Sequence, residues 1–304
     1  MDENIILIDW LSLTSKYYDV LGFQELLGLA GVNWVSTKGA HGYKDRLYFN
    51  GISIHFNGRD DMGVWCEMSG QGCRAFETFG TGDYQKLFDC VFMGDCKITR
   101  IDIAYDDHTG ILDIQRIAND CLCSNYVSRL RSWDVRMSNK GTTIGHGSEQ
   151  SLIYIRIYDK AAERNCAPGT HWIRVEMELH DDRAYEFLML QSSIGDSFCG
   201  VLCNYLRYVV PDEIDSNKSR WAMADYWADL LCGAQKIKLY KKPGIEYNID
   251  RCEHYVYQQS GNAVDALIQI YGSEVFLQKL KQRGTMPNPK YDHLVELYGN
   301  GGLK

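Results

Sequence analysis

Proline is scarce in this sequence, which also has neither a low-complexity tract nor a long run of apolar residues. Only 5 of its 304 residues are proline, and this disfavours extended disordered linkers. No apolar stretch reaches the roughly 20 residues that a membrane-spanning helix needs. The opening MDENIILIDW is acidic and lacks the order of a secretion signal. We therefore expect a globular cytosolic protein with no membrane association, built as one large domain or two smaller ones.

Two kinds of functional motif are also absent. The 11 cysteines include no Cys-x-x-Cys pair, so neither a zinc finger nor a thiol redox motif is indicated. In a cytosolic chain such cysteines are expected to behave as small buried side chains. The glycines form neither a P-loop nor a dinucleotide-binding fingerprint. The sequence therefore predicts no built-in helicase or ATPase.

The net charge of −8 does not favour a protein that binds nucleic acid over its whole surface. Phosphate contact needs only a local basic surface, however. Residues 129–140 contain a single acid, Asp134, among several cations. These candidate DNA contacts are Arg129, Arg131, Arg136 and Lys140. Ordinary solvated surface charge is the alternative interpretation of this cluster.

Strand-like and helix-like segments together predict an α+β fold. Strands are expected at 5–14, 43–49, 52–57, 63–68, 97–106, 130–136, 141–145, 151–160 and 170–180. Helices are expected at 18–30, 84–93, 112–124, 183–191, 196–206, 219–233, 250–259, 262–271 and 273–283. Asn50-Gly51 predicts a tight hairpin. We expect a curved, antiparallel-rich sheet with helices on one face in residues 1–210, followed by a helical C-terminal region, residues 211–304.

Three of the predicted strands pair an apolar face with a face of charged residues and tyrosines. The polar positions are Arg100, Asp102 and Asp106 in 98–106, Tyr154, Arg156, Tyr158 and Lys160 in 152–160, and Arg174, Glu176 and Glu178 in 172–179. A plain solvent-facing sheet would show Thr, Ser, Lys and Glu without order. If the three strands are neighbours, their polar faces form one surface, and the pattern favours a functional site.

The residue types on this surface indicate phosphate chemistry. Clustered carboxylates without neighbouring Cys or His select a hard divalent cation such as Mg²⁺ or Mn²⁺. Arginine and lysine next to such a cation suit a phosphate group. A tyrosine beside both can act as a nucleophile. Together they predict attack on a phosphodiester with the metal stabilising the developing charge.

The same strands carry motifs that resemble the Rep_trans family of rolling-circle replication initiation factors, which includes initiators of plasmids and phages and relaxases of conjugative transposons. Members have a strand of the form Gly-x-x-x-Ser-x-x-x-x-Arg-Ile-Tyr-(Asp/Asn)-Lys-x-x-Glu, matched here by residues 147–163. They also have an upstream Arg-(Leu/Ile)-Asp-(Leu/Ile)-Ala-(Phe/Tyr)-Asp strand, matched by residues 100–106, and a downstream Trp-Arg-Val-Glu. In this chain Ile173 is inserted after Trp172, and Gly145-His146-Gly147-Ser148 stands where the family usually has Gly-Ser-Arg before the catalytic strand. The likeness spans roughly residues 5–180.

The resemblance implies a role for each residue of the polar surface. Tyr158 would be the nucleophile, with Tyr154 on the same face as the alternative or as a DNA contact. Arg156 and Lys160 would lie beside the scissile phosphate. The metal ligands would be Asp102 and Glu176, with Glu67, Asp106 and Glu178 as further candidates. Arg100 and Arg174 would contact DNA or, alternatively, hold the carboxylates in place.

The implied function is sequence-specific nicking and closing of one DNA strand at a replication origin, through a 5′-phosphotyrosine link. Residues 1–210 would form the nicking domain, a host helicase would unwind the DNA, and a host polymerase would extend the free 3′ end. The resemblance leaves a homodimer open. Three alternatives remain at this point: a conjugative relaxase, a non-catalytic DNA-binding regulator on the same scaffold, and a metal-dependent hydrolase that uses water.

The histidines bear on the choice between two classes of tyrosine nickase. The larger class holds its metal with a His-hydrophobic-His triplet, and the 8 histidines of this chain include no such triplet. The absence agrees with a metal site made of carboxylates.

Overall fold

The structure, a computed structural model, describes residues 4–190, 192–232 and 261–282. The chain divides into two compact units, Met1–Leu239 and Tyr240–Lys304. The helix predicted at 250–259 lies outside the described residues. In the part of the chain that is described, no helix is both long enough and apolar enough to cross a membrane.

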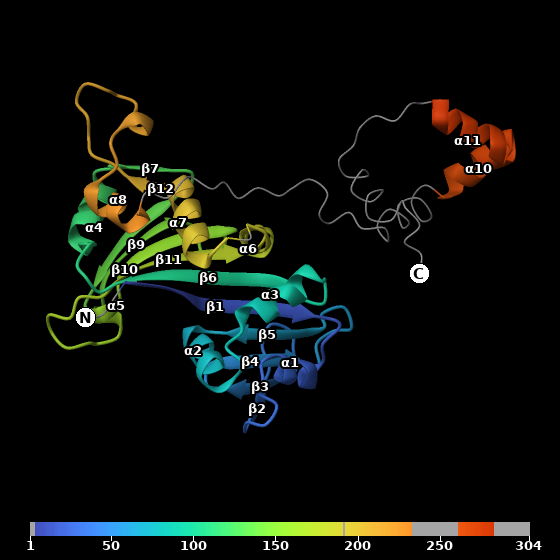
Figure 1. The fold of residues 1–304 in the computed structure, drawn as a ribbon, viewed down its shortest axis with the longest axis horizontal. Helices are drawn as coiled ribbons and strands as arrows, with labels where there is room; N and C mark the ends of the chain where they lie inside the picture. The colour runs from blue at the N-terminus through green and yellow to red at the C-terminus, as the bar shows by residue number, and fades with distance from the viewer. Residues whose placement is uncertain (1–3, 191, 233–260, 283–304) are drawn as a thin grey trace. The chain divides into compact units, whose positions relative to one another are not determined.

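The first unit is built on a sheet of ten strands in the order β2-β3-β4-β5-β1-β6-β11-β10-β9-β8 (Figure 1). All neighbouring strands in this sheet are antiparallel. The strands are β1 Ile5–Ser15, β2 Val35–Lys38, β3 Asp45–Phe49, β4 Ile52–Phe56, β5 Val64–Met68, β6 Lys97–Asp107, β8 Trp133–Ser138, β9 Gly141–Gly147, β10 Ile153–Asp159 and β11 Ile173–His180. A separate two-stranded sheet pairs β7 Tyr126–Ser128 with β12 Leu206–Tyr208.

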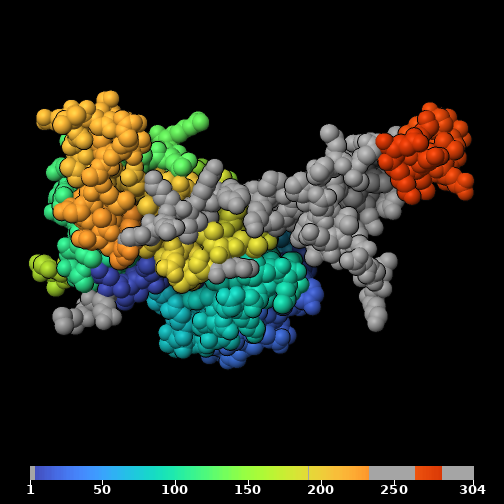
Figure 2. Space-filling view, turned by 45° about the horizontal axis from the view of Figure 1, so that its top comes forward, coloured from blue at the N-terminus to red at the C-terminus, as the bar shows by residue number. Residues whose placement is uncertain are grey.

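Helices cover the apolar face of the ten-stranded sheet. They are α1 Val20–Leu26, α2 Gly70–Phe79, α3 Tyr84–Phe92, α4 Ile114–Leu122, α6 Asp181–Leu188, α7 Ile194–Tyr205 and α8 Asp225–Leu231. Fully buried Ile101 and Ile103 of β6 share one core with Phe76, Phe198 and Trp227 from three of these helices. In Figure 2 the residues coloured cyan, yellow and orange, which include α2, α3, α6, α7 and α8, make up much of the visible surface. The opposite face of the sheet is therefore left for polar residues.

The fold class predicted from the sequence is confirmed: the chain is α+β, with a large antiparallel sheet, helices on one face and helices near the C-terminus. Asn50 and Gly51 both have positive φ, 44° and 89°, as a tight hairpin turn requires. In the second unit, α10 Gly261–Tyr271 and α11 Ser273–Gln282 match the two helices predicted there.

Several elements were missed by the sequence prediction. Helix α2 begins after Ser69, whose side chain caps it by accepting from Gly72 N–H. Glycine is a poor helix former, but here a Cβ at Gly72 would lie 2.3 Å from the carbonyl oxygen of Gly51. The hairpin therefore approaches the helix so closely that glycine is required at this position. Because glycine has a low helix propensity, the sequence did not indicate a helix here. The short strands β2, β7 and β12 were also not predicted.

The predicted division after residue 210 does not coincide with the observed boundary between the two units. Helix α8, which follows the 3-10 helix η1 Lys218–Arg220, packs into the core of the first unit. Its Trp227 is fully buried and donates a hydrogen bond to the backbone oxygen of Leu206, 3.1 Å away. The long helix predicted at 219–233 is shorter because Met223 forms a β-bridge with Val209.

Candidate active site

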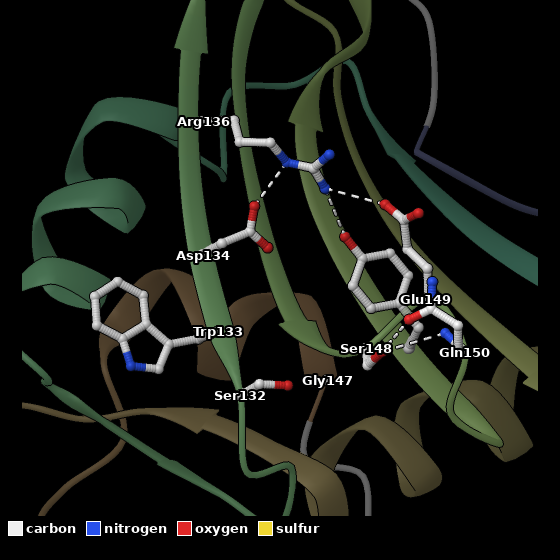
Figure 3. Close-up of a pocket in the computed structure, with 9 residues that line it drawn as sticks. Ser132, Trp133, Asp134, Arg136, Gly147, Ser148, Glu149 and Gln150 are labelled. Carbon is white, nitrogen blue, oxygen red and sulfur yellow. Dashed lines mark hydrogen bonds and ion pairs between the residues drawn. The ribbon is translucent and has the colours of Figure 1, made fainter.

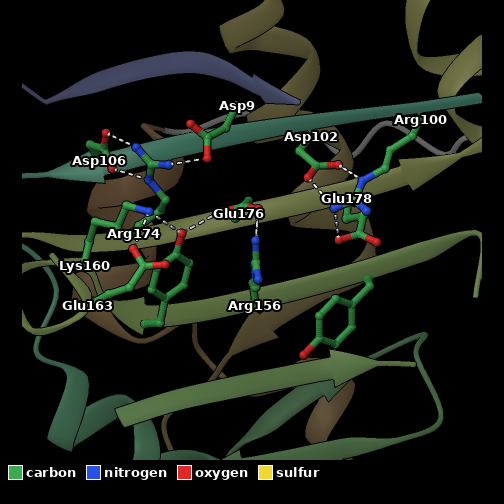
Figure 4. Close-up of polar contacts among 12 residues, drawn as sticks. Asp9, Arg100, Asp102, Asp106, Arg156, Lys160, Glu163, Arg174, Glu176 and Glu178 are labelled. Atoms are coloured by element: carbon green, nitrogen blue, oxygen red, sulfur yellow. Dashed lines mark hydrogen bonds and ion pairs between the residues drawn. The ribbon is translucent and has the colours of Figure 1, made fainter. Parts of the chain in front are cut away.

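The three predicted polar strand faces come together on one side of the sheet. Strand β11 lies between β6 and β10, and its register aligns their polar positions in rows. One row contains Asp106, Arg174 and Tyr158. The next rows are Ala104, Glu176 and Arg156, and then Asp102, Glu178 and Tyr154. We call this surface, which is opposite the helices, the polar face (Figure 4). The expectation that the three strands are neighbours is confirmed.

Tyr158 is held between a carboxylate and an ammonium group. Its hydroxyl donates a hydrogen bond to Glu176 Oε2 at 2.8 Å, and Lys160 Nζ donates to the hydroxyl at 3.2 Å. All three residues are buried. Lys160 was expected to continue the strand, but it begins the short helix α5, Lys160–Glu163, whose N-terminus is capped by Asp159. Its side chain still returns to the Tyr158 hydroxyl and also forms an ion pair with Glu163.

Arg156 shares the same carboxylate. Its Nε and Nη2 atoms lie 3.2 and 2.5 Å from Glu176 Oε1, so one carboxylate binds both the arginine and the tyrosine. The guanidinium also lies over the Tyr158 ring, 5.2 Å from its centre. Arg156 remains 38% exposed, whereas Glu176 is 1% exposed. The arginine is therefore the member of this group that can reach a ligand from solvent.

Burial keeps the Tyr158 phenol protonated. Desolvation raises its pKa well above the ordinary value of 10, and the negative charge of Glu176 raises it further, while Arg174 and Arg156 act in the opposite direction. A phenol in this state is a weak nucleophile until a base accepts its proton. The Glu176 oxygen that already accepts the hydroxyl hydrogen bond is placed for that task.

A second carboxylate group lies one row further along the sheet. Arg100 donates to both oxygens of Asp102, at 2.9 and 2.7 Å, and to Glu178 Oε2 at 2.6 Å. His180 lies 2.7 Å from the other Glu178 oxygen. Asp102 is almost completely buried, which raises its pKa to about 7; Arg100 opposes this shift, and the charges of Glu176 and Glu178 add to it. Glu176 and Glu178 are therefore close enough to disfavour the ionised form of Asp102.

Arg174 forms the third group, at the end of the sheet nearest Tyr158. It donates to both oxygens of Asp106, at 2.6 and 2.7 Å, and its Nη1 lies 2.6 Å from Asp9 Oδ2 of β1. Both Arg174 and Asp106 are buried. This geometry supports the interpretation of Arg174 as the residue that holds carboxylates in place. The predicted role of Asp106 as a metal ligand stays a prediction.

Glu67 lies at a greater distance along the same side of the sheet. It is on β5, and β1 separates that strand from β6. Its register partner is Ser12, which in turn pairs with Arg100. The carboxylate lies 3.3 Å from Nε2 of the buried His55. The structure therefore gives Glu67 a different partner from the other predicted ligands, and its metal role stays a prediction.

The carboxylate oxygens of the polar face suit a hard cation, although Arg100 and Arg156 form ion pairs with them in this structure. Within the described residues no group of three or more His, Cys, Asp or Glu side chains is arranged to hold a metal ion. Asp102, Glu176 and Glu178 supply carboxylate oxygens, the ligands that Mg²⁺ and Mn²⁺ prefer. Burial raises the pKa of Asp102, the charges of Glu176 and Glu178 raise it further, and a bound cation would offset this penalty on the ionised form. These three carboxylates therefore fit such an ion once Arg100 no longer pairs with Asp102 and Glu178.

The predicted basic cluster divides into separate environments. Arg129 Nε donates to the backbone oxygen of Asn204 at 3.1 Å. Arg131 and Lys140 are exposed and form no ion pair within the described part of the chain. Arg136, on β8, forms ion pairs with Asp134 and Glu149 and donates a hydrogen bond to the hydroxyl of Tyr154. The four cations do not make one basic patch with a common set of contacts.

Three residues of the site were not singled out from the sequence. His180 continues the alternation of Arg174, Glu176 and Glu178, so its position was available from the pattern. His55 could not be linked to Glu67 without the pairing of β4 with β5. Asp9 was not predicted to lie on the polar face because β1 has a register shift between Ile8 and Trp10. This shift breaks the simple alternation of faces.

Comparison with known proteins bears on this geometry. Residues 96–280 match the family model described as replication initiation factor, and residues 5–92 match the model of the rolling-circle replication initiation protein N-terminal domain. The chain is 28% identical over 267 residues to the "Putative DNA relaxase NicK" of Bacillus subtilis (strain 168), covering 80% of this chain and 75% of that protein. It is also similar to the solved structure of a rolling-circle replication initiator protein from Geobacillus stearothermophilus. That likeness has a TM-score of 0.70 and 28% identity, and it covers 79% of this chain and all of the other. The chain therefore belongs to the replication initiation factor family of rolling-circle initiators and related relaxases.

Proposed function

We propose that the protein starts rolling-circle replication by cutting one DNA strand with Tyr158 and later rejoining it. The observation that carries this proposal is the position of the Tyr158 hydroxyl, 2.8 Å from Glu176 and 3.2 Å from Lys160. A nucleophile, a base that accepts its proton and a cation that stabilises the resulting phenolate are thereby in contact before any substrate binds. The DNA is the class of substrate that the family implies.

The chemistry proceeds by one exchange of bonds at phosphorus. Glu176 accepts the phenol proton while the Tyr158 oxygen attacks the scissile phosphate, and the bond from phosphorus to the 3′ oxygen breaks. The leaving 3′ oxygen takes a proton from solvent and becomes a hydroxyl, and the 5′ phosphate stays on the tyrosine. Arg156, the exposed cation of the group, binds the phosphate oxygens. Reversal of the same steps with an incoming 3′-OH closes the strand.

A divalent Mg²⁺ or Mn²⁺ ion is the cofactor that the carboxylates fit. Asp102, Glu176 and Glu178 would hold it, and when bound it would stabilise negative charge on the phosphate in the transition state. Lys160 lies within hydrogen-bond distance of the attacking oxygen, so it stabilises the phenolate as the proton leaves. Glu163 pairs with the Lys160 ammonium from one side and so fixes its position.

The free 3′-OH would be extended by a host polymerase. Because the sequence contains no P-loop, unwinding is assigned to a host helicase. A relaxase that starts conjugative transfer is the second candidate, favoured by the relative that carries that name. The nicking chemistry is the same in both cases. A small test plasmid that carries the protein's gene separates the two functions. Replication of the plasmid would indicate an initiator, and its mobilisation between cells would indicate a relaxase.

The decisive experiment looks for the covalent link. Protein and Mn²⁺ are incubated with 3′-labelled single strands that contain a randomised central segment, and the products are separated on a denaturing gel. We expect label on the protein, lost in Tyr158→Phe and kept in Tyr154→Phe, because Tyr154 lacks the Glu176 and Lys160 contacts. Cleavage without a protein-bound label would indicate a hydrolase that uses water. Binding without cleavage would indicate a regulator.

A further inference from the structure

A hollow of about 400 Å³ lies at the edge of the polar face, beside β8 (Figure 3). Its walls come from β8, from the turn between β9 and β10, and from the start of β10. Figure 3 shows the side chains of Asp134 and Glu149 directed toward Arg136, which also donates a hydrogen bond to the Tyr154 hydroxyl. This hollow takes no part in the chemistry assigned to Tyr158, yet it opens on the same side of the sheet.

Arg136 lines the hollow and is held there by acceptors from three segments. Its Nε lies 2.6 Å from Asp134 Oδ2, and its Nη2 lies 3.4 Å from Glu149 Oε1. The same Nη2 donates to the hydroxyl of Tyr154 at 3.0 Å. Tyr154 is 2% exposed, whereas the Arg136 side chain is 55% exposed. A rigid buried tyrosine therefore orients a guanidinium that solvent and ligands can still reach.

A glycine in the backbone of β9 leaves space for the contacts of Arg136 with Asp134 and Tyr154. Gly145 of β9 lies under Tyr154, and a Cβ at this position would lie 2.4 Å from Asp134 Oδ1 and 2.6 Å from the Tyr154 hydroxyl. No side chain larger than hydrogen fits without moving both. The arrangement of carboxylate, guanidinium and phenol thus depends on a glycine at one register position.

The charges in the hollow decide what it can bind. Two carboxylates, Asp134 and Glu149, accompany one guanidinium, so a phosphate would meet net negative charge. Both carboxylates are substantially exposed and each has lone pairs that Arg136 does not occupy. Such a site suits a neutral group with hydrogen-bond donors, as the edge of a nucleobase offers.

The hollow is also at the right place along a bound strand. Tyr154 and Tyr158 are on the same face of β10, four residues apart, which corresponds to about 13 Å at about 3.3 Å per residue. At the stacked spacing of about 3.4 Å per nucleotide this is at most about four nucleotides, and fewer in an extended strand. DNA held at Tyr158 therefore reaches the hollow within a few nucleotides of the cut.

We propose that this hollow reads an unstacked guanine close to the scissile phosphate. Guanine is the base whose Watson–Crick edge places two adjacent donors, N1–H and the N2 amino group, next to an acceptor, O6. A carboxylate of Asp134 or Glu149 accepts from the two donors, and Arg136 donates to O6. Cytosine and adenine offer one amino donor beside a ring acceptor, and thymine offers one N–H between two carbonyls. The inference rests on the proposed function, since it deepens the choice of DNA site for that same reaction.

The test is a selection of strands by the wild-type protein and by altered forms. Covalently captured strands from a randomised pool are sequenced, and guanine is expected at one position within four nucleotides of the cut. In the double variant Asp134→Asn, Glu149→Gln, each new amide replaces an acceptor with a donor that opposes guanine. The guanine preference should fall by about 5- to 140-fold, the range for loss of a bidentate base contact. Inosine at that position, which lacks the N2 amino group, should be captured less well by wild type.

Glu25→Gln is the matched control, because it makes the same change at an exposed carboxylate of α1, on the helix-covered side; it should leave the guanine preference intact. Tyr158→Phe protein, selecting strands by binding alone, separates the two proposals. Guanine enrichment by this variant with no adduct from wild type would remove the Tyr158 chemistry and keep the subsite. Adducts with no guanine preference, or a preference unchanged in the folded double variant, would overturn the subsite.

Discussion

Replacing Glu176 with glutamine tests the assignment of the base most directly. The carboxylate is 1% exposed and accepts both from the Tyr158 hydroxyl at 2.8 Å and from Arg156. Glutamine keeps the shape of the side chain but cannot take the phenol proton. Because burial raises the pKa of Tyr158 above its ordinary value, solvent hydroxide is a poor substitute for that base.

Two magnitudes follow from this geometry. Loss of a positioned general base costs about 10²- to 10⁴-fold in rate. Breaking a fully buried ion pair costs about 3–5 kcal/mol, but Arg156 is 38% exposed and is partly solvated once alone. We therefore expect a loss of roughly 1–3 kcal/mol in the free energy of unfolding. For a unit of this size that corresponds to a fall in Tm of about 2–12 °C.

The assay is single-turnover formation of the protein–DNA adduct, with thermal unfolding of the same samples. Glu186→Gln on α6 is the control, since it makes the same change at a buried carboxylate that pairs with Arg183. The control should lose stability and keep the rate. A folded Glu176→Gln protein that forms adducts at the wild-type rate would refute the assignment. Recovery of the rate at high Mn²⁺ would show instead that Glu176 acts only as a metal ligand.

Three further outcomes are expected from the same geometry. Burial gives Asp102 a pKa of about 7 in the folded protein against 3.8 ordinarily, so the folded state binds the extra proton between these values and the free energy of unfolding falls as pH rises through them. In Asp102→Asn this dependence should vanish, as thermal unfolding in EDTA from pH 5 to 8 will show; an unchanged slope would contradict the assignment. Arg100→Gln should bind Mn²⁺ at least about fivefold more tightly by calorimetry, because Asp102 and Glu178 lose a competing cation; equal affinity would mean that Arg100 stays clear of the metal. Gly145→Ala should lower the free energy of unfolding by about 1–3 kcal/mol through overlap with the Tyr154 hydroxyl, and an unaltered Tm would show that the hollow is loosely packed.

Strand periodicity accounts for what could be predicted about the site. In a strand the side chains alternate, so the membership of a face depends only on where the strand begins. Tyr154, Arg156 and Tyr158 could be grouped for that reason, whichever strand lay beside them. The order of strands could not be obtained in the same way, because β11 inserts between β6 and β10 although it follows both in sequence.

Partnerships between charges were the part that the sequence did not reveal. Arg174 lies in the row of Tyr158, yet it binds Asp106 and Asp9 across the sheet. Asp9 comes from a strand whose register shift places it where alternation does not predict. Lys160 leaves the strand altogether and returns to the Tyr158 hydroxyl from a helix. Such contacts depend on bulges and helix starts, which local patterns of hydrophobicity do not encode.

The balance of charge explains why a cation and DNA should bind together at this site. Five carboxylates of the polar face and β1, Asp9, Asp102, Asp106, Glu176 and Glu178, contact or surround four cations, Arg100, Arg156, Arg174 and Lys160. The group is close to neutral when Asp102 carries its proton, as its raised pKa allows. A phosphodiester adds one negative charge to this surface, and ionisation of Asp102 adds another. One divalent cation would offset both charges, so an ion that favours ionised Asp102 would also favour a phosphate bound beside Tyr158.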